Sequence, residues 1–176
     1  MRSLLLWCLP LAMLAGQENI VSSGKQHPAP GTSLVHFTRI TEGVYSGSKP
    51  HSEADFEYLR SIGVRYILEL HFLPFLTGRE KRKAHRHDIE FVSVRMNASP
   101  ISPSEKHVNQ ALDIMKKKRP IYVHCVLGRD RTGLAAGLYR EYFLGIPKQK
   151  ALLEMKEAGF RDSWFVSGLS RYFKKP

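Results

Sequence analysis

The sequence is poor in cysteine and has no long apolar run. Its two cysteines, Cys8 and Cys125, are too few for the disulfide framework on which small exported domains rely. No stretch reaches the roughly 18 consecutive apolar residues of a membrane-spanning helix, so we expect no stable membrane anchor. With 176 residues, of which 43% are hydrophobic, the chain can bury the core of one domain but not of two ordinary ones.

Acidic residues are also scarce. The chain has 16 Asp and Glu against 27 Lys and Arg, which gives a formal net charge of +11. Such an excess attracts anions and speeds their association, and nucleic acid, membrane surfaces and phosphorylated small molecules would all fit it. The basic stretch at residues 78–87 lacks interleaved aromatic residues for base stacking, so we expect no nucleic-acid partner.

Residues 1–16 differ from the rest of the chain. Arg2 supplies a positive start, residues 4–14 are apolar, and small residues follow, which is the layout of a secretory signal peptide. A buried N-terminal helix is the alternative, and Gln17 stands where a lipoprotein would need its lipid-bearing cysteine. We therefore expect a periplasmic or secreted protein whose mature part keeps only Cys125, and a lone thiol in such a protein suggests a reactive one.

The remaining chain divides into a flexible lead-in at residues 17–33 and one folded domain at residues 34–176. The apolar patterns predict strands at 34–37, 43–46, 64–70, 89–96 and 120–124, and helices at 52–61, 104–118, 132–143, 147–158 and 163–172. Residues 78–87 are expected to form a basic surface helix or loop. Strands that alternate with helices indicate an α/β fold with a central, mostly parallel sheet of four to five strands and helices on both faces.

The most informative segment lies between the last predicted strand and the helix that follows it. It reads His124-Cys125-Val126-Leu127-Gly128-Arg129-Asp130-Arg131-Thr132-Gly133. A loop in this position points successive backbone N–H groups into a concave nest, and the next helix adds its positive N-terminal end. A phosphate group fits such a nest, so we expect it to be bound by Val126, Leu127, Gly128, Arg129, Asp130 and Arg131.

Each chemical role in this loop has a candidate. The nest and the helix dipole would keep Cys125 as the thiolate, which is the nucleophilic form. Gly128 lets the loop turn without a side chain in the way of the anion, and Arg131 can grip two phosphate oxygens with its planar guanidinium. Thr132 could cap the helix and donate to the thiolate when it leaves. The alternative is that Cys125 is a buried structural thiol.

These residues resemble the Cys-x5-Arg signature of the protein tyrosine phosphatase superfamily. Residues 43–50 and 62–68 are similar to the opening of the small bacterial and fungal dual-specificity-like phosphatases, and the resemblance covers about residues 43–165. It implies that residues 34–176 are a single phosphatase domain that works through a cysteinyl-phosphate intermediate without a metal or other cofactor. Sulfur-transfer enzymes of the rhodanese kind also use a cysteine loop, but Arg131-Thr132-Gly133 at the start of a helix favours phosphate.

One part of the family pattern is missing. The family usually has an aspartate about thirty residues before the cysteine, which protonates the leaving oxygen, and residues 95–100 contain no carboxylate here. We exclude Asp88 because it precedes a strand, whereas the cysteine loop follows one. Asp130 resembles the loop acid proposed for myotubularin-type lipid phosphatases, although it could instead only brace Arg129 or Arg131. Without an effective acid, the chain would be a catalytically weak phosphate-binding module.

The basic residues suggest the class of substrate. His71 follows the strand at 64–70, and Arg79 opens a basic stretch that continues with Lys81, Arg82, Lys83, His85, Arg86 and His87. Cationic groups around one phosphate site suit an inositol polyphosphate, and the loop chemistry resembles that of cysteine-type phytases. A phosphotyrosine protein, as for a tyrosine or dual-specificity phosphatase, is the second candidate, and a solvated basic face without a binding role is the third possibility.

Overall fold

The computed structural model describes residues 30–73 and 77–175, so the predicted signal peptide at 1–16 and most of the lead-in lie outside it. The strands are β1 (Thr38–Thr41), β2 (Val44–Ser48), β3 (Tyr66–His71), β4 (Glu90–Arg95) and β5 (Ile121–Cys125). The helices are α1 (Glu53–Ser61), α2 (Gly78–Arg86), α3 (Glu105–Lys117), α4 (Asp130–Leu144), α5 (Lys148–Glu157) and α6 (Ser167–Phe173), with a 3₁₀ turn η2 (Trp164–Val166) before α6. None of the helices in the described ranges is both long and apolar enough to cross a bilayer.

The strands form one five-stranded sheet in the order β1-β2-β5-β3-β4. Only β1 runs antiparallel to its neighbour, whereas β2, β5, β3 and β4 are parallel. Their carboxyl ends, at Ser48, Cys125, His71 and Arg95, therefore lie at one edge of the sheet. Ligands of such sheets bind outside this edge, and Cys125 ends the central strand. The prediction of a mostly parallel sheet is confirmed.

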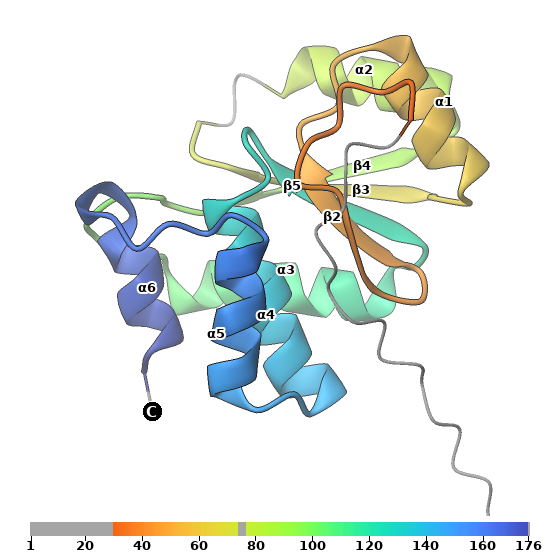
Figure 1. The fold of residues 1–176 in the computed structure, drawn as a ribbon. Coiled ribbons are helices and arrows are strands. Elements are labelled where there is room, and N and C mark those ends of the chain that lie inside the picture. The colour runs from red at the N-terminus through yellow and green to blue at the C-terminus, as the bar shows by residue number, and fades with distance from the viewer. Residues whose placement is uncertain (1–29, 74–76, 176) are drawn as a thin grey trace, which may run out of the picture.

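Helices cover both faces of the sheet, as predicted. In Figure 1, α1 and α2 lie above the sheet, and α3, α4, α5 and α6 lie below it. The side chains of β5 alternate between the two cores, because Tyr122 packs with the first group of helices while Ile121 and Val123 pack with the second. This alternation directs His124 and Cys125 to opposite faces.

The strand predicted at residues 34–37 is wrong, because the strand begins four residues later, at Thr38. His36 adopts a left-handed backbone with φ 54°, which ends extended pairing at that point. Leu34 and Phe37 are nevertheless buried, so their apolar character was correctly interpreted as core. Helix α4 begins at Asp130 rather than at Thr132, because the cysteine loop leads directly into it.

The buried carboxylate of Asp55 holds the start of the domain against helix α1. Ser52 caps α1 as predicted, and Asp55 completes a capping box with it. Asp55 also accepts hydrogen bonds from the backbone and side chain of Ser33, each 2.7 Å long, and from the backbone of His51 at 2.8 Å. Ser33, which we predicted as the last residue of the lead-in, is thus held against α1. Burial alone would raise the pKa of Asp55, but these hydrogen bonds outweigh it and lower the pKa.

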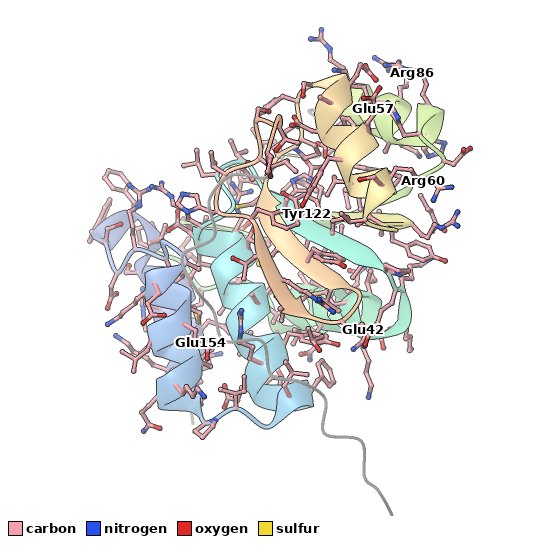
Figure 2. All side chains as sticks on the ribbon, turned by 45° about the vertical axis from the view of Figure 1, so that its right-hand side comes forward. Glu42, Glu57, Arg60, Arg86, Tyr122 and Glu154 are labelled. Atoms are coloured by element: carbon pink, nitrogen blue, oxygen red, sulfur yellow. The ribbon has the colours of Figure 1, made fainter. Side chains whose placement is uncertain are left out.

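We expect Asp55→Asn to lower the free energy of unfolding by about 2–3 kcal/mol at neutral pH, since it removes hydrogen bonds to a charged group and leaves buried donors unpaired. Glu57→Ala, at an exposed position of the same helix (Figure 2), should change little. Because the folded-state pKa of Asp55 is depressed, its contribution is complete above the ordinary value of about 4 and is lost as the pH falls below it. Urea unfolding of both variants at neutral and acidic pH measures this. A penalty for Asp55→Asn that persists unchanged in acid would contradict the assignment.

Candidate active site

Cys125 ends the central strand β5, and residues 126–129 connect it to the N-terminus of α4. Cys125 is a free thiol and is buried, at 3% exposed, whereas the next two residues, Val126 and Leu127, are exposed. The backbone N–H of Lys49 donates to the Val126 carbonyl at 3.2 Å, which ties the loop to the end of β2. The strand–loop–helix arrangement expected from the sequence is therefore present at the carboxyl edge of the sheet.

Glycine is required at position 128 for a different reason from the one expected. Its φ is +70°, and a Cβ there would lie 2.3–2.5 Å from backbone atoms of Gly47 and Ser48. The residue must lack a side chain because the loop packs directly on the backbone of β2. Backbone packing, rather than space for the anion, is the constraint that the structure displays at this position.

Arg131 spans the edge of the sheet. Its Nη1 donates to the carbonyl of Leu70, near the end of β3, at 2.8 Å. Thr132 does not cap α4, contrary to expectation, because the helix starts two residues earlier and Arg129 occupies the N-cap position. The Thr132 hydroxyl is buried and has no hydrogen-bond partner within the described residues, and the same holds for Nε of Arg129.

Asp130 is buried at the first position of α4. Its Oδ1 accepts a hydrogen bond of 3.3 Å from the backbone of Arg161, and its Oδ2 lies 3.7 Å from the Arg161 guanidinium. The charge that it faces is thus Arg161, beyond α5, and not Arg129 or Arg131. Asp88 precedes β4, at the opposite edge of the sheet from Cys125, which agrees with its exclusion.

The two predicted substrate-binding residues lie on different elements. His71 ends β3 and is buried; burial lowers its pKa, and Arg131 and Arg95 nearby lower it further. The imidazole of His71 can therefore donate and accept hydrogen bonds at neutral pH, but it adds little positive charge to the site. Arg79, at the start of α2, is exposed and lines an open groove together with Lys49, Pro50, His51, Gly78, Glu80, Arg82 and Lys83.

A buried polar network behind the cysteine was not anticipated from the sequence. Glu80 of α2 places one carboxylate oxygen 2.7 Å from Nε2 of His124 and the other 2.9 Å from Nζ of Lys49. Lys49 also lies 3.6 Å from Glu69, and Nδ1 of His124 lies 3.3 Å from the carbonyl oxygen of Cys125. The network thus connects the basic helix α2 to the backbone of the candidate nucleophile.

The two carboxylates of this network, Glu69 and Glu80, have pKa values shifted in opposite directions. Burial raises the pKa of Glu69, and the nearby Glu80 raises it further. Burial also favours a raised pKa at Glu80, but His124 and Lys49 outweigh it, so the pKa of Glu80 is lowered. For Lys49 the desolvation that would lower its pKa is outweighed by contacts with Glu80 and Glu69, and the pKa is raised. Glu80 is the single carboxylate in the basic stretch at 78–87, which is the signal that could have identified it.

No group of three or more His, Cys, Asp or Glu side chains in residues 30–73 and 77–175 is arranged to hold a metal ion. The site in that part of the chain instead combines a thiol, backbone amides at a helix N-terminus and an arginine. These groups suit the binding of a tetrahedral anion and nucleophilic attack on it.

Comparison with known sequences agrees with this chemistry. The sequence model of the tyrosine phosphatase family matches residues 33–144. The chain is 25% identical over 141 residues to the dual specificity protein phosphatase TpbA of Pseudomonas aeruginosa, covering 80% of this chain and 62% of TpbA. It is 26% identical over 112 residues to the inositol diphosphatase DSP3 of Arabidopsis thaliana, covering 60% of this chain and 54% of DSP3. The chain thus spans less than two thirds of the length of these curated relatives.

Solved structures share the fold. The core catalytic domain of the PP-IP phosphatase SIW14 of S. cerevisiae, determined in complex with citrate, superimposes with a TM-score of 0.67 at 19% identity. The match covers 80% of this chain and 84% of that domain. The five-stranded sheet with helices on both faces is therefore a phosphatase-like α/β fold.

We expect Lys49→Met to destabilise the protein by about 2 kcal/mol, because it leaves two buried carboxylates close together without their shared cation. Adding Glu69→Gln should recover part of the loss, since it removes one of the repelling charges. Lys118→Met is the matched control, because Lys118 pairs with Glu90 at the exposed surface. Urea unfolding compares the variants. Equal effects of Lys49→Met and Lys118→Met would show that the network contributes nothing beyond a surface ion pair.

Proposed function

The chain belongs to the tyrosine phosphatase family, and on that premise we propose that it is a cysteine-dependent phosphomonoesterase with a cysteinyl-phosphate intermediate. The observation that carries this proposal is the free Cys125 at the end of the central strand, followed by a loop that enters α4 within five residues. The N-terminal amides of α4 and its dipole favour an anion at this point. A thiolate and a phosphate group are both such anions.

In the proposed reaction, the Cys125 thiolate attacks phosphorus and forms a sulfur–phosphorus bond while the bond to the leaving oxygen breaks. A proton from Asp130 neutralises that oxygen. Water then attacks the phosphorus, returns a proton to Asp130, and displaces Cys125 as the thiolate with release of inorganic phosphate. Arg131 holds the equatorial oxygens, and the buried hydroxyl of Thr132, free of partners within the described residues, donates to the departing thiolate.

Asp130 is proposed as the acid because the segment in which the family usually has its aspartate lacks one here. Residues 96–104, which follow β4 and would carry the usual aspartate of the family, contain no carboxylate. Asp130 is the first residue of α4, directly after the cysteine loop, and it is buried. Its contact with Arg161 positions the carboxyl group between the loop and the segment after α5.

An inositol polyphosphate is the substrate class that we propose. The groove beside α2 brings together the cationic side chains of Lys49, Arg79, Arg82 and Lys83, and it adjoins the catalytic loop through the hydrogen bond between Lys49 and Val126. DSP3 and SIW14 are named for inositol diphosphate and PP-IP substrates, which agrees with this charge. Phosphotyrosine in proteins is the second candidate, because TpbA is named a dual specificity protein phosphatase.

We also propose that the protein is exported and that residues 1–16 are removed as a signal peptide. The support is the apolar run at residues 4–14 behind Arg2. Export would leave Cys125 as the single thiol of the mature chain.

One series of variants tests the chemistry. Cys125→Ser should abolish hydrolysis of p-nitrophenyl phosphate. Asp130→Asn should lower kcat by about a hundredfold for an alkyl phosphate and much less for p-nitrophenyl phosphate, whose leaving group needs no proton. Arg161→Gln removes the guanidinium beside Asp130 but keeps the acid and its backbone hydrogen bond, so it should lower kcat for the alkyl phosphate much less than Asp130→Asn does. Activity of Cys125→Ser at the wild-type rate would overturn the proposal, and equal losses of Asp130→Asn on both substrates would exclude Asp130 as the acid.

The substrate class is tested by phosphate release from inositol hexakisphosphate and from a phosphotyrosine peptide. We expect Arg79→Gln/Arg82→Gln to raise KM for the inositol phosphate by about tenfold, because two charge-assisted contacts are lost, and to leave KM for p-nitrophenyl phosphate unchanged. Lys150→Gln/Lys156→Gln on α5 removes the same charge at a distance from the groove and serves as the control. A faster reaction with the peptide, insensitive to the groove variant, would favour the phosphotyrosine alternative.

A further inference from the structure

Several exposed apolar side chains lie in the loop after β4 and in the turn before α6. Trp164, Phe165 and Ile101 are 70%, 72% and 72% exposed. The Trp164 and Phe165 rings contact each other with centroids 5.1 Å apart. The backbone of Gly168 donates to the Ser99 carbonyl at 3.2 Å, so the turn that carries the two aromatic rings adjoins the loop that carries Ile101.

Four further exposed apolar side chains follow directly on the ends of parallel strands. Phe72 and Leu73 come immediately after β3, and Val126 and Leu127 come immediately after β5, in the catalytic loop. Together with Ile101, Trp164 and Phe165 they form what we call the apolar rim. The rim residues come from separate loops, and none of them is among the residues that line the basic groove beside α2.

The charges beside the rim are predominantly positive. Arg95 ends β4, Arg161 precedes Trp164 by three residues, and Arg171 donates to the Pro100 carbonyl beside Ile101. Among the nearby carboxylates, Asp130 and Asp162 face cations, namely Arg161 and Lys174, whereas Glu105 at the start of α3 is exposed. An edge that exposes aromatic and aliphatic side chains between arginines has the composition of a surface that lies in the interface of an anionic bilayer.

We propose that this edge docks on an anionic lipid bilayer, with Trp164, Phe165 and Ile101 inserted at the interface. Burying each of these side chains would contribute favourable transfer free energy, and the arginines would be attracted to the negative lipid headgroups. Docking in this orientation turns the catalytic loop toward phosphate groups carried at the membrane surface. That last consequence rests on the proposed function, whereas docking itself does not.

Binding of the full chain to vesicles tests the proposal. Sedimentation with phosphatidylcholine vesicles and with mixed phosphatidylcholine–phosphatidylglycerol vesicles compares wild type, Trp164→Ser/Phe165→Ser and the matched control Tyr142→Ser/Leu153→Ser. Tyr142 and Leu153 are also exposed apolar side chains, at 59% and 60%, but they lie on α4 and α5, away from the rim. Residues 1–16 are common to all three proteins and cannot cause a difference between them.

We expect wild type and the control to bind the mixed vesicles more strongly than phosphatidylcholine alone, and the rim variant to bind the mixed vesicles at least about tenfold more weakly, since two buried aromatic contacts are lost. Hydrolysis of soluble p-nitrophenyl phosphate reports whether each variant is folded. If the rim variant loses this activity as well, Ile101→Ser replaces it in the comparison and should weaken vesicle binding several-fold.

Three outcomes would overturn the proposal: equal vesicle binding by the rim variant and the control, no preference of wild type for anionic lipid, or a rim variant that keeps vesicle binding while losing activity on a phosphotyrosine peptide. The third outcome would assign the rim to a protein substrate. Cys125→Ser should bind vesicles as wild type does, so failure of the proposed chemistry and failure of the docking surface can be told apart.

Discussion

The backbone contact between the catalytic loop and β2 is the constraint on which the rest of the site depends. Gly128 can approach Gly47 and Ser48 only because it has no side chain. Gly47 in turn must lack one, because its Cβ would lie 2.4 Å from the hydroxyl of Tyr122, which donates to the Ser48 carbonyl at 2.7 Å. Two glycines and one tyrosine thus set how closely the loop lies against the sheet. The position of Cys125 relative to the amides of α4 follows from that distance.

Residues on either side of the loop make three further contacts that hold it in place. Arg131 bonds to the end of β3, Asp130 contacts Arg161 beyond α5, and His124 reaches Glu80 on α2. Each contact joins the loop to a different element, so the donors that would face a phosphate are positioned before any substrate arrives. Preorganised donors of this kind stabilise developing charge without a reorganisation cost at the moment of reaction.

Local patterns predicted most of the fold, and contacts between distant segments account for what they missed. The cysteine loop, the Ser52 cap and the strands β3, β4 and β5 follow from short-range spacing and alternation, which the sequence displays directly. The later start of β1, after His36, depends on a single left-handed backbone dihedral that hydrophobic patterning does not report. Glu80 and Lys49 are separated in sequence by α1 and β3, so their burial against His124 emerges only when α2 packs on the sheet. Residues 78–87 were expected to form a basic surface helix or loop; they form helix α2, but its residues Glu80 and Ala84 belong to the interior.

Two groups of cations lie on different sides of the cysteine loop. The cations of α2 line a groove on the face of the sheet that α1 and α2 cover, next to the end of β2. The arginines beside the apolar rim belong to the end of β4 and to the segments around α6, which lies on the other face. Lys49 contacts Val126 of the catalytic loop from the side of the groove, and Arg161 contacts Asp130, directly after that loop, from the side of the rim. A small polyanion and an anionic surface would therefore approach Cys125 from different sides, so substitutions on one side need not disturb binding at the other.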